Sequence, residues 1–175
     1  MTNLHTLILG GIRSGKSRLA ERLAIESQLS VTYIATATAE DEEMRQRIAN
    51  HREQRPDHWH VIEEPIKLAE TLSKVNTEHC ILLDCLTLWL TNLLLTDDFC
   101  LFTQERDAFL NVLPTLKNRM IIVSNETNMG ITPMGELSRR YCDEAGRLHQ
   151  ALAQHCDQVI LTVAGLPHTL KGQSL

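Results

Sequence analysis

The stretch LILGGIRSGKSRLAE, residues 7–21, constrains the fold of this chain more than any other. Within it, GGIRSGKS fits the pattern G-x-x-x-x-G-K-[ST], with Gly10, Gly15, Lys16 and Ser17 at the defining positions. Such a loop binds phosphate when a strand precedes it and a helix begins at its end. The apolar run before Gly10 and the helical period after Gly15 supply that context. A glycine-rich turn with a chance lysine and serine explains both flanks less well, so we expect a phosphate-binding loop (P-loop).

The P-loop residues have separate chemical tasks. Glycines let backbone N–H groups converge on phosphate oxygens, assisted by the positive end of the following helix dipole. Lys16 would contact the outer phosphates of a nucleotide, and the Ser17 hydroxyl would bind Mg²⁺. Arg13 adds a positive charge at the edge of the loop. We therefore expect a nucleoside triphosphate with Mg²⁺ as ligand.

Asp84 follows the apolar run ILL and is the candidate carboxylate for that metal. A P-loop enzyme needs an acid at the end of a neighbouring strand, where it holds Mg²⁺ directly or through water. The carboxyl ends of strands are also where α/β sheets bind ligands. Alternatively, Asp84 is only the N-cap of the helix that begins at LTLWL. We favour the metal ligand.

The remaining apolar runs predict the fold class. Strands of continuous Ile, Leu and Val separated by helices are typical of a parallel sheet covered on both faces. The sequence therefore predicts a three-layer α/β P-loop domain with a mostly parallel sheet. The expected strands are 5–11, 31–36, 59–64, 80–85, 119–126 and 158–166, and the expected helices are 15–28, 40–55, 86–95 and 135–155.

Composition excludes several classes of protein. The 175 residues are 43% hydrophobic, which suits one compact domain over residues 1–175. A formal charge of -5 gives no basic field for nucleic acid or an anionic membrane. Five cysteines without a CxxC pair argue against a disulfide framework and a zinc site. No apolar run is long enough to span a membrane, and no signal peptide is recognisable. We expect a soluble cytoplasmic protein without stable membrane insertion.

A second basic segment, RIANHREQRPDHWH at residues 47–60, follows the P-loop. A neutral imidazole attacks phosphorus well, and the resulting phosphoramidate can pass its group onward. His51 could be such a nucleophile, with Arg52 and Arg55 neutralising phosphate charge in the transition state. Alternatively, these residues form only a solvated helix face. Spacing does not identify which phosphorus would be attacked.

With these segments assembled, the chain resembles the bifunctional adenosylcobinamide kinase/adenosylcobinamide-phosphate guanylyltransferase family. The resemblance covers nearly the whole chain, to about residue 167, and is weakest at roughly 95–117. The stretches that carry it include LGGIRSGKSRLAE, VTYIATA, the histidine segment, ILLDCLTLWLTNLL and IIVSNETNMGITP. The pattern SNE-x-x-MGI-x-P is especially specific, because ordinary P-loop kinases lack it.

The resemblance implies two reactions in cobalamin biosynthesis and salvage. ATP or GTP first phosphorylates the aminopropanol hydroxyl of adenosylcobinamide. GTP then donates GMP to adenosylcobinamide phosphate, which gives adenosylcobinamide-GDP and pyrophosphate. The histidine that carries GMP in the family falls on His51. Its neighbour here is Asn50, so His51 is the single candidate at that point.

The resemblance also implies a fold, an assembly and a set of site residues. The family fold resembles the RecA-like P-loop architecture, and its members resemble one another in forming homotrimers. Lys16 and His51 are the expected catalytic residues, and Ser17 and Asp84 the expected metal ligands. The implied nucleotide-binding residues are Gly10, Gly11, Ile12, Arg13, Ser14, Gly15, Lys16, Ser17, Ala35, Thr36, Ala37, Arg52, Glu53, Gln54, Arg55, Glu63 and Asp84.

The stretch SNETNMGITP, residues 124–133, follows another predicted strand. Asn125 and Glu126 could position substrate or metal, and residues 129–133 could form a loop over the site. The alternative is a plain turn, because Asn128, Gly130 and Pro133 are common turn residues. We expect a site loop and assign no individual roles.

Two other functions stay open at this point. In a plain P-loop small-molecule kinase, His51 would be incidental. In a GTP-sensing module, the nucleotide would bind without turnover of an acceptor. The second basic segment favours the bifunctional enzyme.

Overall fold

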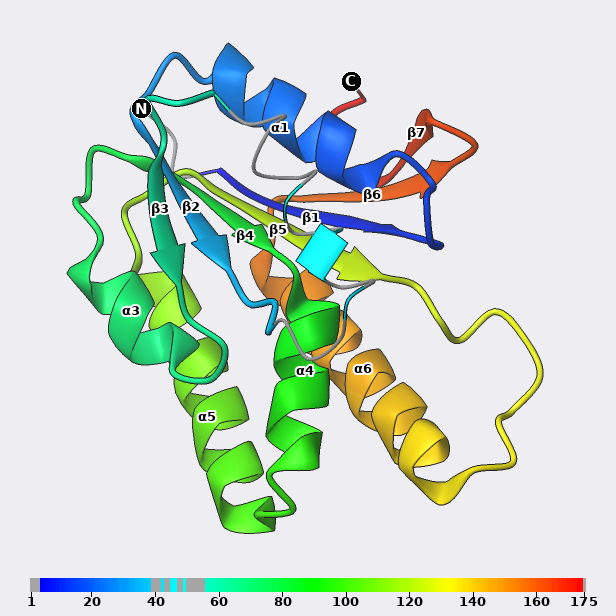
Figure 1. Cartoon of the computed structure of the whole chain (residues 1–175). Helices are drawn as coiled ribbons and strands as arrows, with labels where there is room; N and C mark the ends of the chain where they lie inside the picture. The colour runs from blue at the N-terminus through cyan, green and yellow to red at the C-terminus, as the bar shows by residue number, and fades with distance from the viewer. Residues whose placement is uncertain (1–3, 39–41, 43–44, 47–48, 50–55, 175) are drawn as a thin grey trace.

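A seven-stranded sheet forms the centre of the computed structural model, which describes residues 4–38, 42, 45–46, 49 and 56–174 (Figure 1). The strand order is β3-β2-β4-β5-β1-β6-β7. All pairs between neighbouring strands are parallel except β6 with β7, which is antiparallel. The prediction of an α/β fold with a mostly parallel sheet is confirmed. The strands are β1 His5–Gly10, β2 Val31–Ala35, β3 His60–Glu63, β4 Cys80–Asp84, β5 Met120–Asn125, β6 Gln158–Val163 and β7 Leu166–Lys171.

Helices cover both faces of the sheet. Figure 1 shows α1 on one face, and α3, α4, α5 and α6 on the other. Among the described residues, no helix is long and apolar enough to cross a membrane. The helices are α1 Lys16–Glu26, α3 Leu68–Lys74, α4 Leu86–Leu95, α5 Phe99–Val112 and α6 Glu136–His155, with a 3-10 turn η1 at Leu113–Thr115.

The apolar strands divide the core into two clusters. Alternate side chains of one strand point to opposite faces, so Leu83 and Ile122 join the α3–α6 side while Leu82 and Val123 join the α1 side. The first four residues of β4 and the first five of β5 are buried. This burial on both faces explains why the two strands are uninterrupted apolar runs.

The predicted last strand, 158–166, is wrong in its extent. The chain turns at Ala164 and Gly165, whose φ angles are 51° and 80°, and returns as the antiparallel strand β7. A two-residue turn with positive φ is the usual connection of a tight hairpin. β7 lies at the edge of the sheet and is mostly exposed, so it lacks the apolar run that marked the other strands.

Two helices, α3 and α5, were not predicted. A start signal for α5 was present in the sequence, because the Asp98 side chain caps the helix by accepting from the N–H groups of Cys100 and Leu101. The buried residues of α5 include Phe102 and Phe109, seven positions apart, as one helix face requires.

Trp89 on α4 connects this helix to the segment before α3. Its ring is fully buried and packs on Phe109 with 5.2 Å between ring centroids, and its Nε1–H donates to the Ile66 carbonyl at 2.7 Å. We expect Trp89→Phe to lower the free energy of unfolding by about 1–3 kcal/mol, because the Ile66 carbonyl loses one of its two donors, keeping only the Leu68 N–H, and the ring loses buried contact area. Trp59→Phe, on the other face of the sheet, is the matched control and should cost less. Equal losses in urea titrations would contradict the importance of this hydrogen bond.

Candidate active site

The carboxyl ends of β1, β4 and β5 lie at one edge of the sheet. Gly10 at the end of β1 is in register with Asn125 at the end of β5, and Asp84 of β4 is in register with Val123 of β5. After β1 the chain continues into α1 on one face, and after β5 it continues into α6 on the opposite face (Figure 1). Such a change of direction between adjacent strands opens a crevice where α/β sheets bind ligands.

Gly10 begins the P-loop in a position that only glycine fits. A Cβ at Gly10 would lie 2.4 Å from the Thr162 carbonyl oxygen and 2.6 Å from Ser14 Oγ, and its φ is 154°. Gly15 has φ 96°, and a Cβ there would lie 3.1 Å from the Cα of Gly165. The N–H of Gly165 donates to the Ser14 carbonyl at 2.9 Å. The β6–β7 turn therefore supports the P-loop from behind.

Lys16 reaches back along the loop. Its side chain is buried, and Nζ donates to the Gly11 carbonyl at 2.6 Å. Burial lowers the pKa of Lys16, while the neighbouring Cys85 and the carboxylate of Asp84 act in the opposite direction. Gly11, Ile12 and Arg13 are exposed around it. A partly dehydrated cation held beside the backbone of a glycine-rich loop is suited to binding phosphate.

Asp84 is the last residue of β4 and is half-buried. The Tyr33 hydroxyl donates to its Oδ2 at 3.2 Å. The N-cap of α4 is Cys85, with no side-chain capping bond, so the alternative role of Asp84 as N-cap is wrong. Ser17 lies in the first turn of α1 and is half-buried. A carboxylate and a hydroxyl are oxygen donors of the type that Mg²⁺ prefers, with phosphates completing the coordination.

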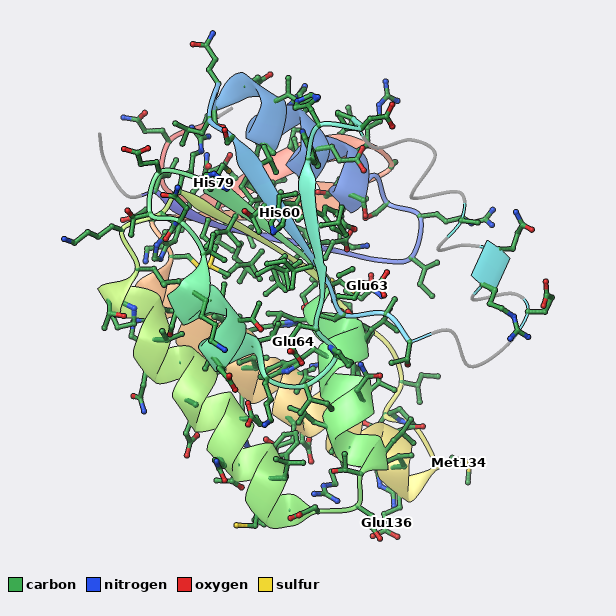
Figure 2. The ribbon with its side chains drawn as sticks, turned by 60° about the vertical axis from the view of Figure 1, so that its left-hand side comes forward. His60, Glu63, Glu64, His79, Met134 and Glu136 are labelled. Carbon is green, nitrogen blue, oxygen red and sulfur yellow. The ribbon has the colours of Figure 1, made fainter. Side chains whose placement is uncertain are left out.

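The ends of β2 and β3 extend the same edge. Ala35 is in register with Asp84 on one side and with Glu63 on the other, so three expected nucleotide contacts share one row of the sheet. Figure 2 shows Glu63 at the end of β3. Ala37 follows in the half-buried segment after β2.

Thr36 has a structural role at this edge. Its buried hydroxyl donates to the Cys85 carbonyl at 2.6 Å and accepts from the Cys85 N–H at 3.0 Å. Its own carbonyl accepts from Asn92 Nδ2 at 2.8 Å. Thr36 thus joins the segment after β2 to the segment after β4, directly beyond the paired residues Ala35 and Asp84.

The second basic segment is largely outside the described residues. This applies to His51, Arg52, Glu53, Gln54 and Arg55, for which no position is given. At the end of this segment, His58 and His60 are exposed and Trp59 is buried.

Glu126 comes from the stretch SNETNMGITP, for which the sequence assigned no individual role. Its N–H donates to the Gly10 carbonyl at 2.9 Å, so this stretch begins directly beside the P-loop. His149 of α6 lies behind Glu126, with Nδ1 3.9 Å from Glu126 Oε2. Sequence reasoning missed His149, because only its place on the buried face of α6 brings it near β5.

Comparison with known proteins identifies the family. A family model described as cobinamide kinase / cobinamide phosphate guanyltransferase, CobU, matches residues 6–170. The chain belongs to this family. A bifunctional adenosylcobalamin biosynthesis protein, CobP, of Pseudomonas aeruginosa is 61% identical over 98% of this chain and 100% of its own length. CobU proteins of Escherichia coli and Salmonella typhimurium are each 37% identical over 94% of this chain and 98% of their own.

Solved structures at low identity share the fold of this family member. The RadB recombinase has a TM-score of 0.53 at 17% identity and covers 91% of this chain and 74% of its own. An ATPase of a type III secretion system has a TM-score of 0.52 at 10% identity, and the match covers 95% of this chain and 57% of the ATPase. These likenesses agree with a RecA-like three-layer α/β architecture.

The two adjacent glycines of the P-loop provide a matched test of its geometry. We expect Gly10→Ala to lower the free energy of unfolding by about 1–3 kcal/mol, because the new Cβ forces the loop away from β6. A Cβ at Gly11 meets no atom within 4 Å, so Gly11→Ala should change the free energy by about 0.5 kcal/mol or less. Thermal and urea unfolding without nucleotide measure both. Equal destabilisation would contradict the close approach to Thr162.

Proposed function

We propose that this protein phosphorylates adenosylcobinamide and then transfers GMP from GTP to the product, giving adenosylcobinamide-GDP and pyrophosphate. The observation that carries the proposal is a P-loop at the sheet's switch point in a chain that matches the family over residues 6–170. Both reactions break a phosphoanhydride bond of a nucleoside triphosphate. One nucleotide site therefore accounts for both reactions, if the adenosylcobinamide hydroxyl and His51 each reach the triphosphate.

In the kinase step, Lys16 neutralises charge on the outer phosphates as the γ-phosphoryl group leaves. Phosphoryl transfer depends mainly on positioning and electrostatic stabilisation. Burial and the hydrogen bond to the Gly11 carbonyl keep the Lys16 ammonium at the loop. The glycines of the loop leave its backbone N–H groups free to bind the phosphates. The acceptor hydroxyl then attacks in line with the departing nucleoside diphosphate.

In the guanylyltransfer step, His51 is the nucleophile. Its neutral imidazole attacks the α-phosphorus of GTP, a P–N bond forms, and pyrophosphate leaves with the electrons of the broken P–O bond. The phosphate of adenosylcobinamide phosphate then attacks the guanylyl-histidine and releases the imidazole. Arg52 and Arg55 stabilise the charge of the transition state. This assignment rests on the sequence and the family, since these residues lie outside the described part of the chain.

Mg²⁺ is the cofactor we propose, held by Ser17 and Asp84. The fit is supported by the half-buried Asp84 carboxylate at the end of β4, whose negative charge also acts on Lys16. In the described ranges there is no group of three or more His, Cys, Asp or Glu that would hold a metal without the nucleotide. Bound there, Mg²⁺ would neutralise triphosphate charge.

We assign the remaining expected contacts to the nucleotide. Ala35, Ala37 and Glu63 lie along the row that continues from Asp84, where a base or ribose would extend from the phosphates. Thr36 would contribute through the position of its backbone, since its hydroxyl is bound to Cys85. Glu53 and Gln54 complete the set by family resemblance. ATP and GTP are both candidate phosphoryl donors.

We further propose a single domain over residues 1–175 that assembles as a homotrimer in the cytoplasm. The single sheet that contains every described strand supports one domain. The five cysteines are free, which suits a reducing compartment. The trimer is supported by family resemblance, and exposed Leu166 and Leu170 on the edge strand β7 offer apolar surface for an interface.

Labelling with radioactive GTP tests the covalent step. Protein incubated with Mg²⁺ and α-labelled GTP should retain label after denaturation, and γ-labelled GTP should leave none. The label should be acid-labile and alkali-stable, as a phosphoramidate is. We expect His51→Ala to abolish it while formation of adenosylcobinamide phosphate continues, because the kinase step does not use the imidazole.

Lys16→Met should impair both reactions. Both the label and the kinase product should fall by about 10²-fold or more, since both reactions use the same phosphate-binding loop.

Full labelling of His51→Ala would refute His51 as the nucleophile. Kinase turnover without any label in the unaltered protein would favour a plain kinase, and GTP binding without either product would favour a nucleotide sensor.

A further inference from the structure

Glu126 directly follows β5, which pairs with the strand that leads into the P-loop, and the functions above do not use it. Its N–H is bonded to the Gly10 carbonyl, and Lys16 Nζ is bonded to the carbonyl of Gly11. The Glu126 backbone and the Lys16 ammonium are therefore attached to two consecutive residues of one loop. Outer phosphates bound by Lys16 would therefore lie beside Glu126.

The Glu126 carboxylate is held in place by its surroundings. Its side chain is 16% exposed. Oε1 accepts from the N–H of Asn128 at 2.7 Å, and Asn128 is itself anchored to α6 because its Nδ2 donates to the Cys142 carbonyl at 3.0 Å. Oε2 is left to face His149 Nδ1 at 3.9 Å. One oxygen is thus fixed by the backbone, and the other faces His149 on α6.

His149 Nδ1, which faces that second oxygen, is buried and has no hydrogen-bond partner in the described part of the chain. The Tyr141 hydroxyl on the same helix is also buried. Burial raises the pKa of Tyr141 to about 12, the Thr87 side chain lowers it, and the Glu126 carboxylate contributes a small increase. Buried polar atoms are nearly always paired in proteins, so the unpaired Nδ1 beside a carboxylate points to a ligand that binds there.

The tautomer of His149 follows from its two neighbours. Burial lowers the pKa of His149, so the ring is neutral and carries one proton. Nε2 lies 2.8 Å from the buried Ser124 Oγ, which can donate to it. The proton is then on Nδ1, where it faces the carboxylate, whereas the other tautomer would direct a lone pair at Glu126 Oε2. His149 therefore presents a donor to Glu126.

We propose that Glu126 is the general base of the kinase step and that His149 is its positioning residue. This inference rests on the kinase half of the proposed function. Three features support it: attachment of Glu126 to the loop that holds Lys16, one fixed carboxylate oxygen, and one oxygen that faces the unpaired Nδ1 of His149. A general base must reach the proton that it removes, and a switch-point position beside the phosphates meets that need.

The step balances as follows. The acceptor hydroxyl oxygen forms a bond to the γ-phosphorus, and the bond from that phosphorus to the β–γ bridging oxygen breaks. The nucleoside diphosphate leaves with the bond electrons, and the hydroxyl proton moves to Glu126 Oε2. The Nδ1–H of His149 stays where it is and holds the carboxylate in the direction of the acceptor. The proton on Glu126 passes to water after the product leaves.

Glu126→Gln in the full-length protein tests the base. We expect kcat for adenosylcobinamide phosphate formation to fall by about 10²–10⁴-fold, because the amide cannot accept the proton. The dissociation constant for nucleotide and the labelling by α-labelled GTP should stay near those of the unaltered protein, since neither uses this proton transfer. Glu136→Gln is the matched control, because Glu136 is exposed at the outer end of α6 (Figure 2).

Two variants of His149 test its positioning role. In His149→Asn the side-chain nitrogen replaces Nδ1 and keeps a donor for Glu126, whereas in His149→Gln it replaces Nε2 and keeps a partner for Ser124. We expect His149→Gln to lower kinase kcat by about 10–100-fold, with His149→Asn clearly more active. Unfolding midpoints measured for both variants separate this effect from stability. Equal kcat at equal stability would overturn the positioning role.

The outcomes for Glu126 are distinguishable from failure of the proposed function. Unchanged kinase kcat in Glu126→Gln would overturn the base alone. Equal loss of kinase product and α-label would overturn it as well, because Glu126 would then serve phosphate or metal binding in both reactions. An unaltered protein that forms no adenosylcobinamide phosphate would refute the proposed function itself.

Discussion

The close packing of Gly10 between its two neighbouring strands is the constraint on which the rest of the site depends. Gly10 is in register with Asn125 of β5 on one side and with Thr162 of β6 on the other, and a single additional carbon would collide with the Thr162 carbonyl. The P-loop therefore leaves the sheet at one fixed point. Lys16, the Gly165 turn and Glu126 are all bonded to this short loop, so their relative positions follow from that one contact.

The charged groups of the site are arranged at the boundary between core and solvent. Lys16 is dehydrated beside the backbone of its own loop, and the Asp84 carboxylate is partly covered and bonded to Tyr33. Groups held in this way need little reorganisation when charge develops in a transition state, which is the main source of rate enhancement in phosphoryl transfer. Lys16 is held by a backbone carbonyl and Asp84 by the Tyr33 hydroxyl.

Two transfers from one nucleotide site require acceptors on different sides of the triphosphate. The β5–α6 side carries Glu126, Tyr141 and His149, next to the loop that Lys16 spans. The β2–β3 side carries the row of Ala35 and Glu63, and the second basic segment, residues 47–60, ends in the sequence at the first residue of β3. In the proposed function, this division would give the α-phosphorus and the γ-phosphorus separate environments.

The sequence by itself determined the P-loop, the buried strands and the acid at the end of β4, because each depends on local spacing and on continuous apolar runs. It also supplied the family resemblance and, through it, His51. The hairpin of β6 and β7 escaped prediction, since an exposed edge strand needs no apolar pattern. Only the tertiary structure decided that His149 faces Glu126 and that Gly165 supports the P-loop. Those contacts join segments more than twenty residues apart, and their geometry is set by strand register and helix packing, which local sequence patterns do not encode.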